Sequence, residues 1–141
     1  MGKELKPVRL VEKNMTEEKV QSQIVQYLKA QYPKVLFKSD MAGIKLPMGY
    51  AVKLSKLRSD KGFPDIDIFE PRRGYHGFHL ELKRDKVRLF KKGGLTYSSP
   101  HIGEQAETHS KLMERGYWAG FACGFDEAKA KIDWYLKKSP K

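Results

Sequence analysis

Residues 62–86 of this chain read GFPDIDIFEPRRGYHGFHLELKRDK, and their acidic side chains have a spacing that suits metal-assisted chemistry. Asp65 and Asp67 alternate with isoleucines, while Glu81 and Lys83 alternate with leucines. Successive side chains of a β-strand point to opposite faces, so the charged residues of each segment share one face. If the two segments pair with their aliphatic residues toward helices, the acids and the lysine cluster on one surface of the sheet.

Such a cluster predicts a metal site. Two neighbouring carboxylates repel each other unless a hard cation lies between them, and Mg²⁺ takes oxygen ligands while it keeps several waters. A bound cation acidifies a water and neutralises charge on a phosphoryl group, and a nearby ammonium orients that water. Asp65 and Glu81 are therefore candidate ligands, and Lys83 is a candidate for the ammonium.

The same residues also have a plainer interpretation. Glu-x-Lys alternation is common on the solvent-facing side of an antiparallel strand, and an aspartate after a proline is a good turn residue. Asp67 and His79 share the predicted face, but both types are also common as polar surface residues. The segment EPRRGYH between the two strands predicts a turn and hence antiparallel pairing.

A helix is predicted after residue 15, with Thr16 as its N-cap and Pro33 as the residue that prevents its continuation. Its apolar stripe includes Val20 and Ile24, and at about 100° per residue the stripe also includes Glu17. A carboxylate on the buried side of a helix needs a partner. We therefore expect Glu17 at the metal site, either as a ligand or through a water.

The charge of the chain indicates an anionic partner. Lys and Arg number 28 against 17 Asp and Glu, which gives a net charge of +11 and an isoelectric point near 9.7. Nucleic acid is the first candidate, and phosphate contacts position it without reading its sequence. The expected phosphate-binding residues are Lys45, Lys53, Lys56, Arg58, Lys61, Arg84, Lys86, Arg88, Lys91 and Lys92.

Other classes of protein are disfavoured by composition. No apolar run approaches the roughly 18 to 20 residues that span a bilayer, and the N-terminal residues lack the apolar core of a signal peptide. The single cysteine, Cys123, excludes both a disulfide framework and a cysteine-rich zinc site. We expect a cytoplasmic protein with no membrane partner and no small-molecule cofactor.

The element order predicts an α/β fold with a mixed central β-sheet flanked by helices. A basic N-terminal arm, residues 1–14, precedes a single domain, residues 15–137. The expected order within this domain is α-β-β-β-α-β-α, with Gly116 ending the fifth element and Asp126 as the N-cap of the last helix. The basic connection over residues 84–100 is long enough to be either a DNA-contacting flap or a solvated linker.

The order of these segments resembles a known family. EEKVQSQIVQYLKAQYP, GFPDIDIF, HLELKRD and EQAETHSKLMERGYWAGF follow one another as in the PD-(D/E)XK nuclease superfamily, specifically its VRR-NUC branch. The resemblance covers roughly residues 15–136. It implies a restriction-endonuclease-like core, with Asp65 as the motif aspartate, Glu81 and Lys83 as the E-x-K half, and Glu17 as the acid of the first helix.

The resemblance also implies functions for other residues and for the whole chain. Gln105 matches the glutamine that opens the helix after the motif, and Gln21 matches a polar position that often faces the site. The Leu82 carbonyl is expected to complete the metal ligands. The implied activity is a Mg²⁺-dependent endodeoxyribonuclease, with Mn²⁺ able to substitute, that selects branched DNA such as four-way junctions and acts as a homodimer.

Two rival interpretations belong to other classes. A non-catalytic nucleic-acid-binding module with a nuclease-like fold would have the same charge, but it gives no reason to place acids where phosphates should dock. A structural protein held by polyanions explains the charge and leaves Glu17 unexplained.

Overall fold

The structure is a computed structural model that describes residues 16–40, 47–57 and 62–137. The predicted arm over residues 1–14 lies outside the described residues. So do three of the expected phosphate-binding residues, Lys45, Arg58 and Lys61.

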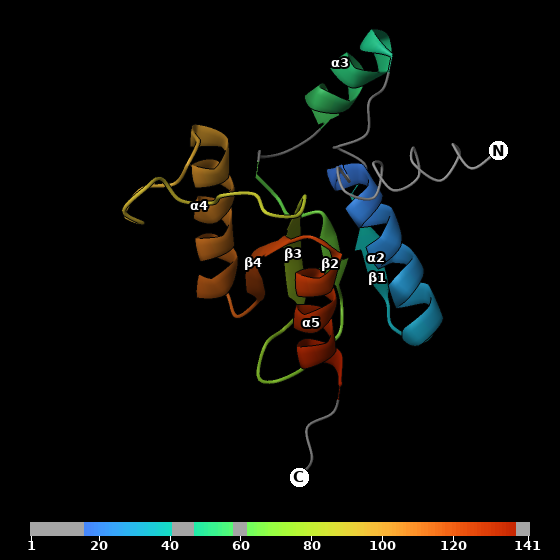
Figure 1. Ribbon diagram of the computed structural model, residues 1–141. Helices are drawn as coiled ribbons and strands as arrows, with labels where there is room; N and C mark the ends of the chain where they lie inside the picture. Colours follow the sequence, from blue (N-terminus) through green and yellow to red (C-terminus); the bar gives the residue numbers. More distant parts are fainter. Residues whose placement is uncertain (1–15, 41–46, 58–61, 138–141) are drawn as a thin grey trace, which may run out of the picture.

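The described chain forms helices and strands that alternate except at β2 and β3, which follow each other directly (Figure 1). In order they are helix α2 (Glu17–Gln31), strand β1 (Phe37–Ser39), helix α3 (Met48–Leu57), strand β2 (Ile66–Ile68), strand β3 (Phe78–Lys83), helix α4 (Pro100–Glu114), strand β4 (Trp118–Cys123) and helix α5 (Phe125–Leu136).

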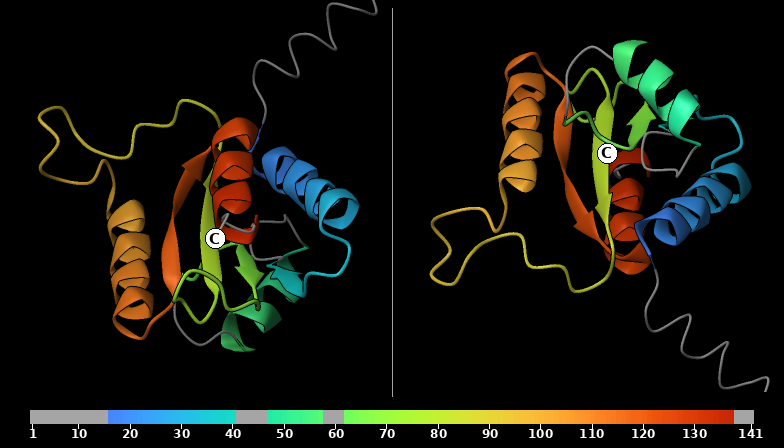
Figure 2. Two further views of the ribbon diagram at one scale, coloured as in Figure 1. Left: turned by 90° about the horizontal axis from the view of Figure 1, so that it is seen from below. Right: turned by 90° about the horizontal axis from the view of Figure 1, so that it is seen from above.

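The strands form one mixed sheet in the order β1-β2-β3-β4. β1 pairs with β2 and β2 with β3 in antiparallel fashion, whereas β3 and β4 are parallel because α4 crosses between them. Both views in Figure 2 show α4 on one side of the sheet and α2 and α5 on the other. The predicted α/β fold class, with a mixed sheet flanked by helices, is confirmed.

Helix ends follow local sequence signals. The Thr16 hydroxyl accepts a hydrogen bond from the Lys19 N–H at 3.2 Å, and the Ser99 hydroxyl caps α4 just before Pro100. α4 ends at the left-handed Gly116, as expected (φ 93°). The prediction of Asp126 as N-cap is wrong: α5 begins at Phe125, and Asp126 lies in its first turn.

Helix α3 was not predicted, because residues 40–61 have the composition of a polar, glycine-containing connection. Figure 1 shows α3 at the top of the picture, above the sheet. The large side chains that the structure describes on α3 are exposed, with Met48 and Leu57 each 82% accessible, so these residues give no apolar stripe of the kind that identifies a core helix. The signal that could have identified it is Pro47, because proline is common where helices begin.

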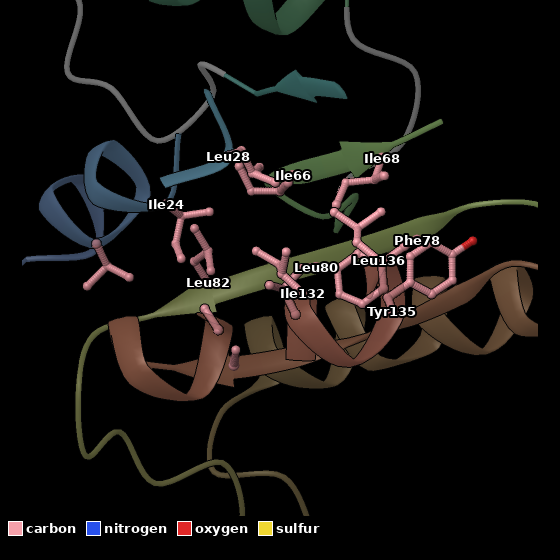
Figure 3. Close-up of a cluster of buried hydrophobic side chains, with 13 residues drawn as sticks. Ile24, Leu28, Ile66, Ile68, Phe78, Leu80, Leu82, Ile132, Tyr135 and Leu136 are labelled. Carbon is pink, nitrogen blue, oxygen red and sulfur yellow. The ribbon is translucent and has the colours of Figure 1, made fainter. Parts of the chain in front are cut away.

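The hydrophobic core lies between the sheet and the pair α2 and α5 (Figure 3). Ile66 and Ile68 of β2 and Leu80 and Leu82 of β3 point toward these helices, all with 1% or less of their surface exposed. The strand parity predicted for both segments is therefore correct. The helices contribute Val20, Ile24, Leu28, Ala128, Ile132, Tyr135 and Leu136.

The outer edge of β4 is closed by side chains rather than by another strand. The Ala119 N–H donates to Met113 Sδ at 3.3 Å, and the Cys123 N–H donates to Glu127 Oε1 at 2.7 Å. Between them, Lys131 Nζ donates to the Phe121 carbonyl at 2.6 Å. Three backbone groups that would otherwise face solvent at the edge are thus satisfied.

Among the described helices, none combines the length and the apolar character needed to cross a membrane.

Candidate active site

Strand β3 turns three polar side chains toward α4. His79, Glu81 and Lys83 alternate with the core leucines, and Glu81 and Lys83 keep only 3% and 4% of their surface exposed. The interpretation of Glu-x-Lys as solvent-facing surface is therefore wrong, because α4 covers this face of the sheet. Burying two charged groups is unfavourable unless they are paired or bind a cation.

Asp65 lies directly before β2 and is held against β3 by two hydrogen bonds. Its backbone N–H donates to the Leu80 carbonyl at 3.1 Å, and its Oδ2 accepts from the Leu82 N–H at 2.8 Å. In a strand, the N–H and the carbonyl of every second residue point toward the same neighbouring strand. The Leu82 carbonyl therefore points to the side of β2 and Asp65, like the Leu80 carbonyl. Asp65, Glu81 and the Leu82 carbonyl thus meet at the end of β2 and β3, as predicted.

The two carboxyl groups interact strongly. Burial, followed by the neighbouring charge of Asp65, raises the pKa of Glu81 to about 9. Burial also raises the pKa of Asp65, against the hydrogen bond from Leu82. Glu81 Oε1 is buried and has no hydrogen-bond partner. Without a cation, the pair therefore holds a proton at neutral pH and leaves an acceptor oxygen unsatisfied.

Lys83 extends from the same face. Its Nζ lies 3.7 Å from Glu81 Oε2 and 6.0 Å from the centre of the Phe121 ring on β4. The positive charge of Lys83 acts against the rise in the pKa of Glu81, and it is a smaller effect than burial. The ammonium group is therefore fixed next to the paired carboxyl groups by a buried strand rather than by a loop.

Helix α4 covers the cluster with two polar residues. Gln105 is 4% exposed; its amide nitrogen lies 3.2 Å from His101 Nε2, and its Oε1 is buried without a partner. One turn later, His109 packs edge-on against Phe121 with ring centres 4.5 Å apart. Burial, then the charges of Lys83 and His79, lower the pKa of His109 to about 4, so His109 is neutral.

The position of Glu17 differs from the prediction. Glu17 is the first residue of α2 and is exposed, not on the buried side of the helix, because the first buried position is Val20. Its charge nevertheless contributes to the raised pKa of both Asp65 and Glu81. Glu17 is thus near the cluster, at its solvent side.

Sequence reasoning missed Asp40, which follows β1. Its N–H donates to the Asp65 carbonyl at 2.7 Å, and its charge adds to the rise in the Asp65 pKa. The Gln21 amide holds this end of β1, through Ser39 Oγ at 2.7 Å and the Asp40 carbonyl at 2.6 Å. The available signal was an acid placed immediately after a short strand.

Gly62 is a second residue that sequence reasoning did not single out. It has a φ of 88°, and a Cβ there would lie 2.9 Å from Thr108 Oγ1 and 3.0 Å from the Glu104 carbonyl. Only glycine allows the segment leading to Asp65 to lie this close to α4. Gly62 therefore positions Asp65 relative to Gln105.

Asp67 and His79 form a separate pair on the same face. They are opposite each other in the β2–β3 register, and His79 Nδ1 lies 2.6 Å from Asp67 Oδ1. His79 Nε2 is buried without a partner.

The candidate ligands at the cluster are all oxygen atoms, the donor type that a hard divalent cation prefers, but only two of them come from side chains. Within the described ranges, no group of three or more His, Cys, Asp or Glu side chains is arranged to hold a metal. The candidate ligands are two carboxylates and one carbonyl, all oxygen donors, and the unsatisfied Glu81 Oε1 is available to a cation. Mg²⁺ characteristically binds through one or two carboxylates and several waters.

The expected phosphate-binding residues that the structure describes are all exposed. Lys53 and Lys56 lie on α3, and five others lie between β3 and α4: Arg84, Lys86, Arg88, Lys91 and Lys92. This segment extends beyond α4 in every view (Figures 1 and 2).

Comparison with solved structures shows a likeness over most of the chain. A solved structure described as a VRR_NUC domain protein superposes with a TM-score of 0.62 and 28% sequence identity, over 87% of this chain and 89% of that chain. No family model matches the sequence, and no curated protein matches it. The likeness to the VRR_NUC structure agrees with the resemblance drawn from the sequence motifs.

Proposed function

We propose that this chain, which has a VRR-NUC-like nuclease fold, is a metal-dependent endonuclease that hydrolyses phosphodiester bonds in DNA. The observation that carries the proposal is the buried set of Asp65, Glu81 and Lys83 at one end of the sheet, in which Glu81 Oε1 lacks a partner. A module that only binds DNA has no use for buried acids beside its basic surface. The charge of +11 supports a polyanionic substrate.

In this proposal Asp65, Glu81 and the Leu82 carbonyl would hold Mg²⁺, with Glu17 contributing as a ligand or through a water and Mn²⁺ able to substitute. The cation would supply an acidified water and neutralise charge on the scissile phosphate. Asp65 is oriented by the Leu82 N–H, so its ligand oxygen is fixed before the metal binds.

Lys83 acts on the attacking water. Its ammonium, 3.7 Å from Glu81 Oε2, holds this water by a hydrogen bond and stabilises negative charge as the phosphorus–oxygen bond breaks. Gln105 is a positioning residue, because its unsatisfied Oε1 is available to accept a hydrogen bond from Lys83 or from the water.

The basic residues on α3 and between β3 and α4 would contact phosphates, and phosphate contacts do not read a base sequence. This favours selection of substrates by DNA structure. The resemblance extends the proposal to branched substrates and a homodimer.

The test is cleavage of end-labelled four-way junction, flap, single-stranded and duplex DNA in Mg²⁺ or Mn²⁺. Lys83→Met and Asp65→Asn should bind DNA but reduce cleavage by about a hundredfold or more. The control is Lys34→Met, which removes the same charge from an exposed position beyond the far end of α2, about 22 Å along the helix from Glu17. Equal binding by all variants with no cleavage in either metal would assign the chain to the non-catalytic binding modules.

A further inference from the structure

The segment between β3 and α4 contains an ordered hairpin, residues 88–98, which we call the basic hairpin. The Lys91 N–H donates to the Thr96 carbonyl at 2.7 Å, and the Ser98 N–H donates to the Leu89 carbonyl at 2.8 Å. Phe90 and Tyr97 are paired across the hairpin, with stacked rings 4.9 Å apart. The hairpin is therefore a defined element rather than a solvated linker.

The tip of the basic hairpin presents a hydrophobic side chain to solvent. Gly93 and Gly94 make the turn with φ values of 100° and 76°, and Leu95 follows them. Leu95 is 96% exposed, more than any other large hydrophobic side chain of the described residues. A single exposed leucine is ordinary on a protein surface, so its surroundings must decide whether it has a function.

Those surroundings are uniformly basic. Residues 86–103 contain Lys86, Arg88, Lys91 and Lys92 and no acidic residue. The hairpin also begins five residues after Lys83, so the segment that carries it leads directly from the strand with the candidate active site. All four basic residues precede Gly93, so they lie on the segment that leads to the tip. Cations that hold phosphates next to an apolar side chain are the combination with which proteins insert a wedge between bases.

We propose, on the basis of the DNA substrate proposed above, that the basic hairpin inserts Leu95 into the base stack at a point where stacking is already interrupted. Separating two stacked base pairs of continuous duplex is unfavourable. At a branch point the base stack is already interrupted, so most of this free energy of unstacking is not required. The same hairpin therefore binds branched DNA more tightly than continuous duplex. The wedge thereby supplies selectivity for DNA structure without any contact that reads sequence.

The test uses the full chain in EDTA, where binding is separated from metal-dependent cleavage. A four-way junction with 2-aminopurine at the branch point reports unstacking as a rise in fluorescence. Wild type should produce this rise, whereas Leu95→Ala should lose most of it and bind the junction about tenfold more weakly, with a smaller preference over duplex.

Three further variants make the result specific. Leu95→Met should retain the fluorescence rise because it keeps an apolar side chain of similar volume. Leu95→Lys should bind duplex more tightly and still lose the rise, since charge cannot replace the wedge. Leu36→Ala, at a leucine that is 65% exposed elsewhere, is the control and should behave as wild type.

The outcomes separate this inference from the nuclease proposal. If Leu95→Ala matches wild type in the fluorescence rise and in junction preference, or if wild type binds no DNA, the wedge is rejected. If wild type unstacks the branch point in a Leu95-dependent way but cuts nothing in Mg²⁺ or Mn²⁺, the wedge stands and the nuclease proposal fails.

Discussion

Glu81 and Lys83 are ionisable residues with almost no contact with water. Their burial lowers the stability of the fold but fixes their positions before any ligand binds. Burial is the largest cause of the rise in the Glu81 pKa, and the charge of Asp65 adds to it. The two acids can both ionise only when a cation compensates them. At the residue scale, protonation and metal binding are therefore competing ways of satisfying the same pair.

This competition predicts how stability depends on pH. In EDTA the Glu81 carboxyl has a pKa near 4.5 when unfolded and about 9 when folded, so the folded state retains a proton that the unfolded state loses. Stability should fall as pH rises through this window. Glu81→Gln removes the effect, so it should be more stable than wild type by up to about 5 kcal/mol at pH 8 and should show no such gain at pH 4.

Urea unfolding at the two pH values measures this difference. Glu18→Gln, the same change at an exposed residue of α2, is the control and should show no pH-dependent gain. Adding Mg²⁺ should stabilise wild type and not Glu81→Gln. A Glu81→Gln variant that is equally destabilised at both pH values would contradict the assignment of the buried acid pair.

At the scale of elements, the short segment before β2 determines where Asp65 sits. Gly62 approaches the backbone and Thr108 of α4 too closely for any side chain. Gly62→Ala should therefore lower stability by about 2 to 3 kcal/mol and reduce cleavage, because the segment must move away from α4.

The matched control is Gly74→Ala in the turn between β2 and β3. Gly74 has a similar φ of 83°, but a Cβ there would meet no atom within 4 Å. Gly74→Ala should lower the free energy of unfolding by about 1 kcal/mol, the cost of placing alanine at a positive φ, and should keep its cleavage activity. Equal losses in both variants, measured by urea unfolding and by cleavage, would show that crowding against α4 is unimportant.

The sequence predicts elements whose pattern is local and misses those set by distant contacts. Alternation of period two identified the faces of β2 and β3, because a strand permits no other arrangement of Ile66 and Leu80. Asp40 was missed because its place after a short strand is only a weak signal, and its approach to Asp65 depends on the pairing of β1 with β2. Glu17 was misplaced because an ideal helical stripe ignores that the first turn of α2 is open to solvent.

At the scale of the whole molecule, the net positive charge predicts a steep dependence of DNA binding on salt. Each phosphate contact contributes a slope of about 0.9 to the plot of log affinity against log salt. Lys91→Ala with Lys92→Ala should reduce the slope by nearly two units if both residues of the basic hairpin contact phosphates.

The comparison variant carries Lys29→Ala and Lys34→Ala, which remove the same charge as the hairpin variant. Both residues are exposed and lie near the C-terminal end of α2. Its slope should remain near that of wild type. Titrations of fluorescent duplex between about 50 and 200 mM salt give all three slopes. Equal slopes for the two double variants would mean that only the total charge matters.

The capped outer edge of β4 limits how two copies of this chain can assemble. Joining two sheets edge to edge at β4 would require Met113, Glu127 and Lys131 to release backbone groups that they already satisfy. It would also separate Lys131 from its ion-pair partner Glu127, 3.7 Å away. A second copy of this chain would therefore not extend the sheet at β4, and this edge resists the addition of strands that begins fibrous aggregation.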